Sequence, residues 1–252
     1  VLADNPAGAM IDRDGEPVGW LCPNQPRTRE HITAYLHEVV SEYDVDGMVL
    51  DYFRFPSIQR KRANSCFCPD CDRKFKAEYG LHIKEVGDFD ERFVKFRQDS
   101  IDPLFEECIQ LIRDTKPEIP TMMYLGAYSS VIYRAQNWPT WVRKGLLDIV
   151  CISGYQATLP GFIDVCRRSR LITKSSNPDG RIYIAQGIHS SNQKLNSSEE
   201  VIERIEKSRE EGAEGQVLFY YKALLPFIDD VGKTCFARPA EPETLFPHKS
   251  SD

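Results

Sequence analysis

The sequence predicts an α/β fold built on a parallel β-sheet, and three observations lead to this prediction. Short apolar runs bounded by turn residues recur along the chain, and amphipathic helical patterns lie between them. Such alternation is typical of parallel strands joined by right-handed helical crossovers. In addition, no glycine-rich phosphate-binding turn follows any predicted strand. This removes the usual reason for an open doubly wound sheet, so a barrel is favoured over it.

The first part of the chain contains a predicted hairpin, a helix and the first strand of the parallel sheet. Residues 9–22 read as a hairpin that turns at an Asp-Gly pair, a common tight-turn dipeptide. Apolar residues at helical spacing predict a helix over 27–43 and a longer one over 91–115. Between them lie a buried strand that ends at Asp51 and a long loop over 56–90.

The rest of the chain alternates regularly between strands and helices. Further strands are predicted over 121–125, 148–153, 181–186 and 216–221, with helices over 138–144, 161–173 and 198–212. The domain prediction is therefore one (β/α) barrel portion over residues 1–236. A Pro-rich, polar C-terminal tail over 237–252 follows it.

Composition limits the classes of function. The chain has 252 residues, a net charge of -6 and 41% hydrophobic residues, which is ordinary for a globular protein able to bury a core. The negative charge argues against nucleic acid as the main partner, since phosphate binding needs a basic face. No apolar run approaches the length of a membrane span, and no signal peptide is visible, so the location of the protein stays open.

Five separated stretches carry a resemblance to a known family. They are GWLCPNQPRTREHI (19–32), YDVDGMVLDYFRFP (43–56), CFCPDCDRKF (66–75), WPTWVRKGLLDIVCISGY (138–155) and EEGAEGQVLFYY (210–221). In this order they resemble a family of bacterial glycosidases, the glycosyl-hydrolase-like family ten. The resemblance implies a (β/α)8 TIM barrel, of which this chain would carry only strands four to eight. The first three would lie upstream of Val1, and five strands cannot close a barrel.

Asp51 is the candidate catalytic residue. In a barrel, chemistry takes place at the carboxyl ends of the strands, and Asp51 lies at such an end. The resemblance also implies an acidic active-site residue in the 43–56 motif. Asp51 would act as nucleophile or would stabilise the transition state, unless Arg54 or loop amides merely satisfy its charge. Arg54 would hold Asp51 ionised or bind an acidic sugar, and its alternative is an internal salt bridge.

The other strand ends offer polar and aromatic residues but no second carboxylate. They read Gly126-Ala127-Tyr128, Gly154-Tyr155-Gln156, Gly187-Ile188-His189 and Tyr220-Tyr221-Lys222. Aromatic faces and polar tips suit a carbohydrate cleft. The predicted substrate-binding residues are Arg54, Tyr155, Gln156, His189, Tyr220 and Tyr221. Because glycoside hydrolysis normally needs two carboxylates, the partner of Asp51 would be Asp12, Asp14 or Glu16 of the hairpin, or would come from the absent strands.

A second candidate site is the C-x-C-x-x-C triplet of Cys66, Cys68 and Cys71. This close spacing is typical of thiolate zinc sites, which need a fourth ligand. Cys22 and His82 are the candidates, and neither spacing is diagnostic. A structural zinc ion that fixes the long loop is the hypothesis, against free or oxidised cysteines as the alternative. No cofactor is required for the predicted catalysis.

The sequence therefore predicts a glycoside hydrolase that acts on a polysaccharide or oligosaccharide by carboxylate chemistry. Two alternatives stay open. One is a carbohydrate-binding barrel without catalytic activity, and the other is a zinc-stabilised α/β domain that binds a partner.

Overall fold

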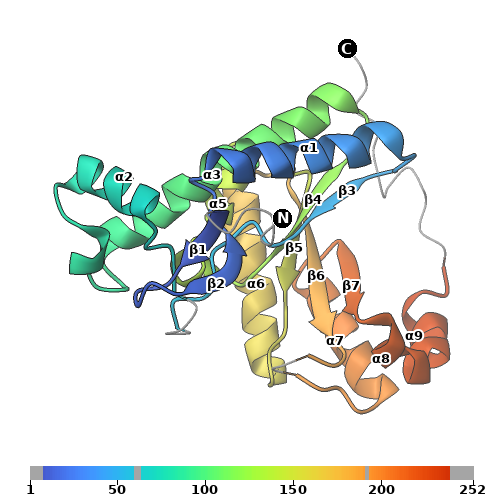
Figure 1. Cartoon of the computed structure of the whole chain (residues 1–252). Helices are drawn as coiled ribbons and strands as arrows, with labels where there is room; N and C mark the ends of the chain where they lie inside the picture. Colours follow the sequence, from blue (N-terminus) through green and yellow to red (C-terminus); the bar gives the residue numbers. More distant parts are fainter. Residues whose placement is uncertain (1–7, 60–63, 191–192, 239–252) are drawn as a thin grey trace. The chain divides into compact units, whose positions relative to one another are not determined.

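The structure is a computed structural model that describes residues 8–59, 64–190 and 193–238 (Figure 1). The chain forms two compact units. The first unit consists of residues up to 45, 52–117 and 129–138, and the second of residues 46–51, 118–128 and 139 onward. Most of the predicted tail, residues 239–252, lies outside the described residues. No helix in the described ranges is both long and apolar enough to cross a membrane.

The first unit begins with the predicted hairpin. Strands β1 (Ala9–Ile11) and β2 (Pro17–Leu21) pair antiparallel. Gly15 adopts a φ of +98°, a conformation that glycine adopts without steric cost. The Asp12 carboxylate accepts hydrogen bonds from the backbone N–H groups of Asp14 (3.0 Å) and Glu16 (2.8 Å). The side chain of Asp12 therefore stabilises the turn.

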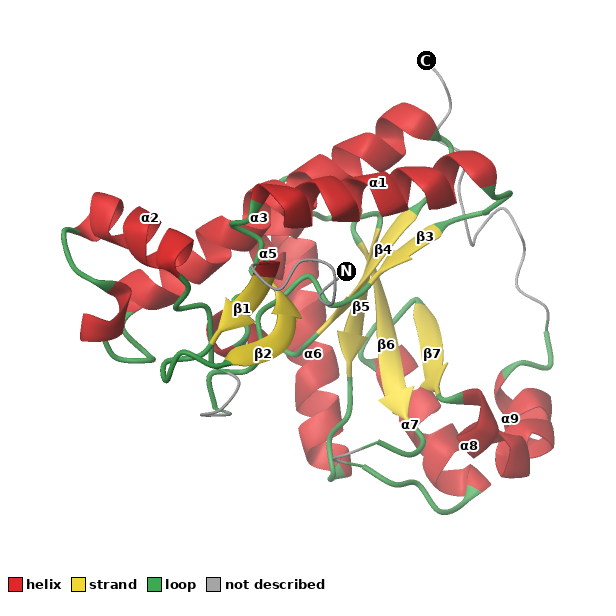
Figure 2. Ribbon diagram, viewed as in Figure 1, coloured by secondary structure: helices red, strands yellow, loops and turns green. Residues whose placement is uncertain are grey.

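Two long helices of the first unit pack against each other, α1 (Pro26–Glu42) and α3 (Glu91–Thr115) (Figure 2). Asp90 caps α3 by accepting a hydrogen bond from the backbone N–H of Arg92 (2.9 Å). The buried apolar face of α3 consists of Phe93, Phe96, Ile101, Leu104, Phe105, Cys108, Ile109 and Ile112. These residues confirm the predicted helical spacing.

The predicted long loop over 56–90 is wrong over residues 69–79 and 83–85. It contains α2 (Pro69–Tyr79) and the short 3-10 helix η2 (Ile83–Glu85). Pro69 occupies the first turn of α2, and Gly80 ends the helix with a φ of +74° while its N–H donates to the carbonyl of Lys76 (2.9 Å). The apolar face of α2 is narrow, because only Cys71 and Phe75 are buried, and this hides its periodicity. One further helical turn of this unit is α4 (Ser130–Tyr133).

The second unit is built on a five-stranded sheet of order β3-β4-β5-β6-β7, with every neighbouring pair parallel. The strands are β3 (Met48–Leu50), β4 (Thr121–Leu125), β5 (Ile149–Ser153), β6 (Arg181–Gly187) and β7 (Gly215–Phe219). Strand order thus follows sequence order, as in a TIM barrel. Within the described chain the sheet ends at β3 on one side and β7 on the other.

Strand register divides the side chains between two faces of this sheet. Directly paired residues share a face, and residues two apart on one strand do so as well. We call one of these faces the Asp51 face. Toward the carboxyl ends of the strands its residues are Asp51, Tyr124, Cys151, Ser153, Tyr155, Tyr183, Ala185, Gly187, Gly215, Val217 and Phe219. The opposite face is buried and mostly apolar, through Leu50, Met123, Leu125, Val150, Ile152, Ile182 and Ile184.

Helices of the second unit follow the strands, as predicted. They are α5 (Trp138–Arg143), α6 (Leu159–Ser176) and α7 (Ser198–Glu210), and α6 packs on β5 and β6. At its C-terminal end the sequence prediction is incomplete. Strand β7 stops at Phe219, and α8 (Tyr221–Leu224), η3 (Leu225–Phe227) and α9 (Ile228–Cys235) follow. Val231 of α9 is buried in one apolar cluster with Val201 and Ile205 of α7.

A substitution at Gly154, directly after β5, tests how closely α6 packs on the sheet. A Cβ atom at this position would lie 2.8 Å from the Phe162 ring and 3.1 Å from Ile184 Cγ2. We expect Gly154→Ala to lower the free energy of unfolding by about 1–3 kcal/mol, because the core cannot accept the extra methyl group. Urea denaturation measures this change.

Gly232→Ala is the matched control, since nothing lies within 4 Å of the added methyl group. Within helix α9 it should raise stability by about 0.5–1 kcal/mol through helix propensity. Equal stability of Gly154→Ala and the parent protein would contradict the described contact between Phe162 and the sheet.

Candidate functional site

Asp51 follows β3 directly and is exposed to solvent. Its negative charge raises the pKa of two residues, Cys151 in β5 and Tyr155 just after this strand. Burial is the main cause that raises the pKa of Tyr155, and the charge of Asp51 raises it further. Burial likewise raises the pKa of Cys151 to about 12, again with a contribution from Asp51. The carboxylate of Asp51 therefore lies within electrostatic reach of the neighbouring side chains of the Asp51 face.

A row of aromatic rings continues this face toward β7. The ring centroids are 6.3 Å apart for Tyr124 and Tyr155, and 5.8 Å apart for Tyr155 and Phe219. Phe219 in turn contacts Tyr220 edge-on at 5.5 Å. Phe219 and Tyr220 are 46% and 40% exposed, so the end of this aromatic row is open to solvent. Sequence reasoning identified Tyr155 and Tyr220 but not Tyr124 or Phe219, whose places on the Asp51 face follow only from strand register.

Two glycines make room for tyrosine rings on the same face. A Cβ atom at Gly187 would lie 2.9 Å from Tyr155 Cδ1, and one at Gly215 would lie 2.5 Å from the Tyr183 ring. Each tyrosine therefore lies over the backbone of the neighbouring strand. A glycine in a strand often marks such a close approach, so this signal was available in the sequence.

The other predicted substrate-binding residues of the second unit lie at strand ends outside this row. The backbone N–H of Gln156 donates to the carbonyl of Gly154 (2.8 Å), and its side chain is half-buried. His189 is exposed and pairs through its backbone with Lys194. Tyr221 opens α8 and is 68% exposed.

Arg54 belongs to the first unit, where its guanidinium lies against two aromatic rings. Its Cζ is 4.4 Å from the Tyr52 ring centroid and 5.0 Å from that of Trp20. The two rings contact each other at 5.5 Å. Tyr52 has a φ of +63°, which is costly for a residue with a bulky side chain. Neither Trp20 nor Tyr52 was identified from the sequence, although both lie in motifs that carry the family resemblance.

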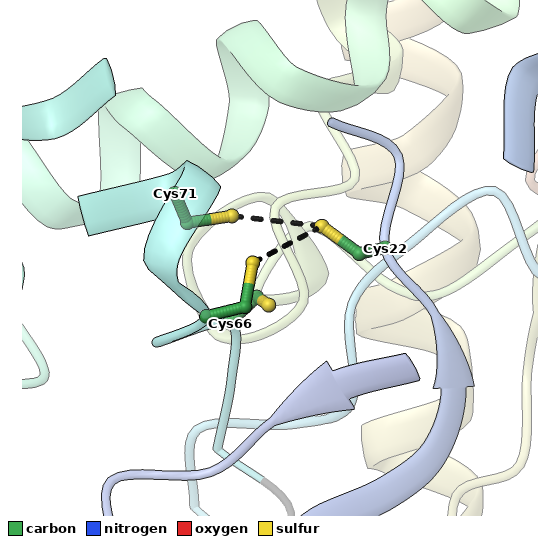
Figure 3. Close-up of side chains that lie close together, drawn as sticks. Cys22, Cys66 and Cys71 are labelled. Carbon is green, nitrogen blue, oxygen red and sulfur yellow. Dashed lines mark hydrogen bonds between the residues drawn. The ribbon is translucent and has the colours of Figure 1, made fainter. Parts of the chain in front are cut away.

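Four cysteines of the first unit form a compact cluster, which we call the cysteine cluster. The sulfur atoms of Cys22, Cys66, Cys68 and Cys71 all lie within 4.8 Å of one another, and all four residues are buried. Figure 3 shows the sulfurs of Cys22, Cys66 and Cys71 pointing toward one another. Cys22 Sγ lies 3.5 Å from that of Cys71 and 3.9 Å from that of Cys68. Hydrogen bonds from the neighbouring thiols hold the pKa of Cys68 well below its usual range.

Of the two residues considered for the fourth position, Cys22 is the one in the cluster. His82 uses both ring nitrogens elsewhere: Nδ1 lies 2.8 Å from an Asp72 carboxylate oxygen, and Nε2 lies 3.1 Å from Lys76 Nζ. Three more cysteines are buried singly, at Cys108, Cys151 and Cys166. Burial raises the pKa of each to about 12, as expected for core thiols.

The sequence of the chain matches a known family over most of its length. The model of the family described as glycosyl hydrolase-like 10 matches residues 8–202. The chain belongs to this family. No curated protein sequence matches the chain.

Three solved structures that share the fold of this chain are two glycosidases and one glycoside hydrolase domain. The PgaB (BpsB) glycoside hydrolase domain from Bordetella bronchiseptica aligns with a TM-score of 0.66 at 12% identity, over 94% of this chain and 72% of that one. A β-galactosidase from Bacillus circulans sp. alkalophilus gives 0.62 at 14% identity, over 86% of this chain. Bee venom hyaluronidase gives 0.53 at 12% identity, over 85% and 79% of the two chains.

At such low identity these likenesses show the fold, and they confirm the predicted TIM-barrel type of α/β architecture. The family assignment confirms the resemblance found in the sequence. The chain spans 38% of the length of the Bacillus β-galactosidase. What that enzyme does as a whole is therefore not carried over to this chain.

The electrostatic effect of Asp51 on Tyr155 gives a test of the site that needs no substrate. Removing the negative charge favours the phenolate, so Asp51→Asn should lower the pKa of the Tyr155 hydroxyl. The pKa is followed by NMR titration of protein labelled at the tyrosine Cζ carbon, with Tyr155→Phe to assign the signal.

Asp46→Asn is the control, because Asp46 is exposed at the opposite end of β3 and its replacement changes the net charge equally. It should leave the Tyr155 titration nearly unchanged. An identical titration of Asp51→Asn and the parent protein would contradict the described position of Asp51.

Proposed function

We propose that the protein hydrolyses glycosidic bonds of a polysaccharide or oligosaccharide, with Asp51 as one of the acting carboxylates. The observation that carries the proposal is the position of Asp51. It is an exposed carboxylate at the carboxyl end of a strand, on the same sheet face as a row of partly exposed aromatic rings. Membership of the glycosyl hydrolase-like 10 family and the TIM-barrel glycosidase fold support it.

The surroundings of Asp51 suit the chemistry. The carboxylate of Asp51 would serve as nucleophile or stabilise the positive charge that develops on the sugar ring. The rings of Tyr155, Phe219 and Tyr220 would present flat apolar surfaces to the faces of a sugar. Gln156, His189 and Tyr221, at the carboxyl ends of β5, β6 and β7, would bind hydroxyl groups of the sugar.

The proposed reaction needs a second carboxylate. Of the five strand-end segments, all of which lie in described ranges, only the one after β3 carries an acidic residue. Among the hairpin candidates, Asp12 is 6% exposed and its carboxylate accepts two backbone hydrogen bonds of the turn. Asp14 and Glu16 are exposed. Asp12 therefore serves the turn, whereas the carboxylates of Asp14 and Glu16 are open to solvent.

Hydrolysis is tested by release of reducing sugar from a panel of neutral and acidic polysaccharides, with the full-length protein. Removing the charge of Asp51 in Asp51→Asn preserves the shape of the side chain. We expect the rate to fall on the order of 10²–10⁴-fold, the usual loss for an acting carboxylate.

Asp46→Asn controls for the loss of one negative charge and should keep the parent rate. Equal rates for Asp51→Asn and the parent would show that Asp51 takes no part in the chemistry. If neither folded protein releases sugar but both bind it in calorimetry, the hydrolase proposal fails, and the carbohydrate-binding barrel replaces it.

A further inference from the structure

The cysteine cluster has the dimensions of a site for a single metal ion. Zinc binds thiolate sulfur at about 2.3 Å, which places the four sulfurs of a tetrahedral site about 3.8 Å apart. In the cluster, Cys22 Sγ lies 3.5 Å from Cys71 Sγ and 3.9 Å from Cys68 Sγ. We propose that Cys22, Cys66, Cys68 and Cys71 bind one structural zinc ion as four thiolates.

The spacing of the sulfurs separates this proposal from an iron–sulfur cluster held by four cysteines. An iron–sulfur cube places its own iron and sulfide atoms between the cysteines and holds them farther apart than a single ion does. All four sulfurs here lie within 4.8 Å of one another. A catalytic zinc ion keeps one position open for water or substrate, whereas four buried thiolates fill the coordination shell. The site is therefore structural.

The surroundings supply what a buried thiolate site needs, namely hydrogen-bond donors to sulfur. The backbone N–H of Ile11 donates to Cys66 Sγ (3.5 Å), and Asn24 Nδ2 donates to Cys71 Sγ (3.4 Å). Two further hydrogen bonds hold the Asn24 side chain in this orientation. Its Nδ2 also donates to Ser100 Oγ (2.8 Å), and its Oδ1 accepts from Lys74 Nζ (2.9 Å). Such outer partners orient metal ligands and stabilise their charge.

A buried positive charge lies near the cluster and points to the same conclusion. One zinc ion and four thiolates carry a net charge of about -2, which needs compensation in a buried site. Arg97 is 0% exposed; burial lowers its pKa to about 9, and the charges of Asp88 and Cys66 oppose this effect. Asp88 already forms an ion pair with Arg13 (2.7 Å). Nη2 of Arg97 donates to the carbonyl of Pro56 (2.7 Å), but Nε and Nη1 have no hydrogen-bond partner among the described residues.

The cluster also joins segments that are distant in the sequence. Cys22 follows β2, and Cys68 directly precedes the first turn of α2. Cys66 lies beside β1, because the backbone N–H of the next residue, Phe67, donates to the carbonyl of Ile11 (2.8 Å). A zinc ion would fasten the β1–β2 hairpin to α2. Trp20 lies two residues before Cys22 and packs on Tyr52 at 5.5 Å. The ion would therefore also hold Trp20 in place.

The metal is identified on the full-length parent protein, purified without added zinc or chelator. Elemental analysis should find about one zinc ion per chain, and X-ray absorption at the zinc edge should show four sulfur neighbours at about 2.3 Å. Iron in place of zinc, nitrogen or oxygen among the neighbours, disulfides by mass spectrometry, or four freely titrating thiols without metal would each overturn the proposal.

Variants test the assignment of the fourth ligand. Cys22→Ser should lower the zinc content from about one ion per chain to near zero and lower the melting temperature. Cys108→Ser is the matched control, since Cys108 is an equally buried thiol of the first unit outside the cluster. It should keep its zinc, as should His82→Ala. Full zinc content in Cys22→Ser would exclude Cys22 as a ligand. If this variant does not fold, the number of sulfur neighbours in the parent protein decides whether four cysteines bind the ion.

A fluorescence measurement tests the structural role of the ion. Trp138 and Trp141 are fully buried, whereas Trp20 is partly exposed, so acrylamide quenching reports mainly on Trp20. Removal of zinc by a chelator should increase quenching in the parent protein and not in Trp20→Phe. Unchanged quenching after zinc loss would show that the ion does not hold the hairpin. None of these readouts depends on glycosidase activity, so the two proposals succeed or fail separately.

Discussion

Register in the parallel sheet is the constraint on which the candidate active site depends. Side chains alternate between the faces of a strand, so a slip of one residue would exchange the two faces. In the observed register Leu50 pairs with Met123 on the buried apolar face, and this fixes Asp51 on the other. The hydrophobic effect on the helix-covered side therefore decides where the carboxylate lies. A slip would move Asp51 into apolar surroundings, which is costly for a charge.

Small residues let this face hold large rings without disturbing the ladder. Tyr155 and Tyr183 each lie over a glycine of the neighbouring strand, Gly187 and Gly215. Glycine normally weakens a strand, but here it makes room for an aromatic ring beside the backbone. The opposite face also contains a polar pair, in which Gln186 Nε2 donates to Gln216 Oε1 (3.0 Å). This hydrogen bond reduces the free-energy cost of burying the two amide groups in an apolar layer.

The sequence predicted the alternation of strands and helices and the place of Asp51, because both depend on local periodicity. It did not predict α2, whose boundaries carry the signals Pro69 and Gly80 but whose buried face is only two residues wide. Nor could it choose between Cys22 and His82, since spacing along the chain does not determine which side chain meets the triplet in space. Tyr124 and Phe219 were missed for a similar reason. Strand register, which sequence periodicity leaves open, brings them beside Tyr155.

The motif around Asp51 is divided between the two compact units of the chain. Residues 46–51 belong to the unit built on the sheet, and the residues that follow, from Tyr52, belong to the unit that contains the cysteine cluster. The change takes place at a single peptide bond, next to a tyrosine in a left-handed conformation. Such a backbone persists only where surrounding contacts hold it, and Trp20 and Arg54 supply contacts to the Tyr52 ring. Because Trp20 lies close in sequence to Cys22, stability at the cysteine cluster bears directly on how firmly Tyr52 is held. The proposed structural metal would in this way help to keep the backbone at Tyr52 in one conformation.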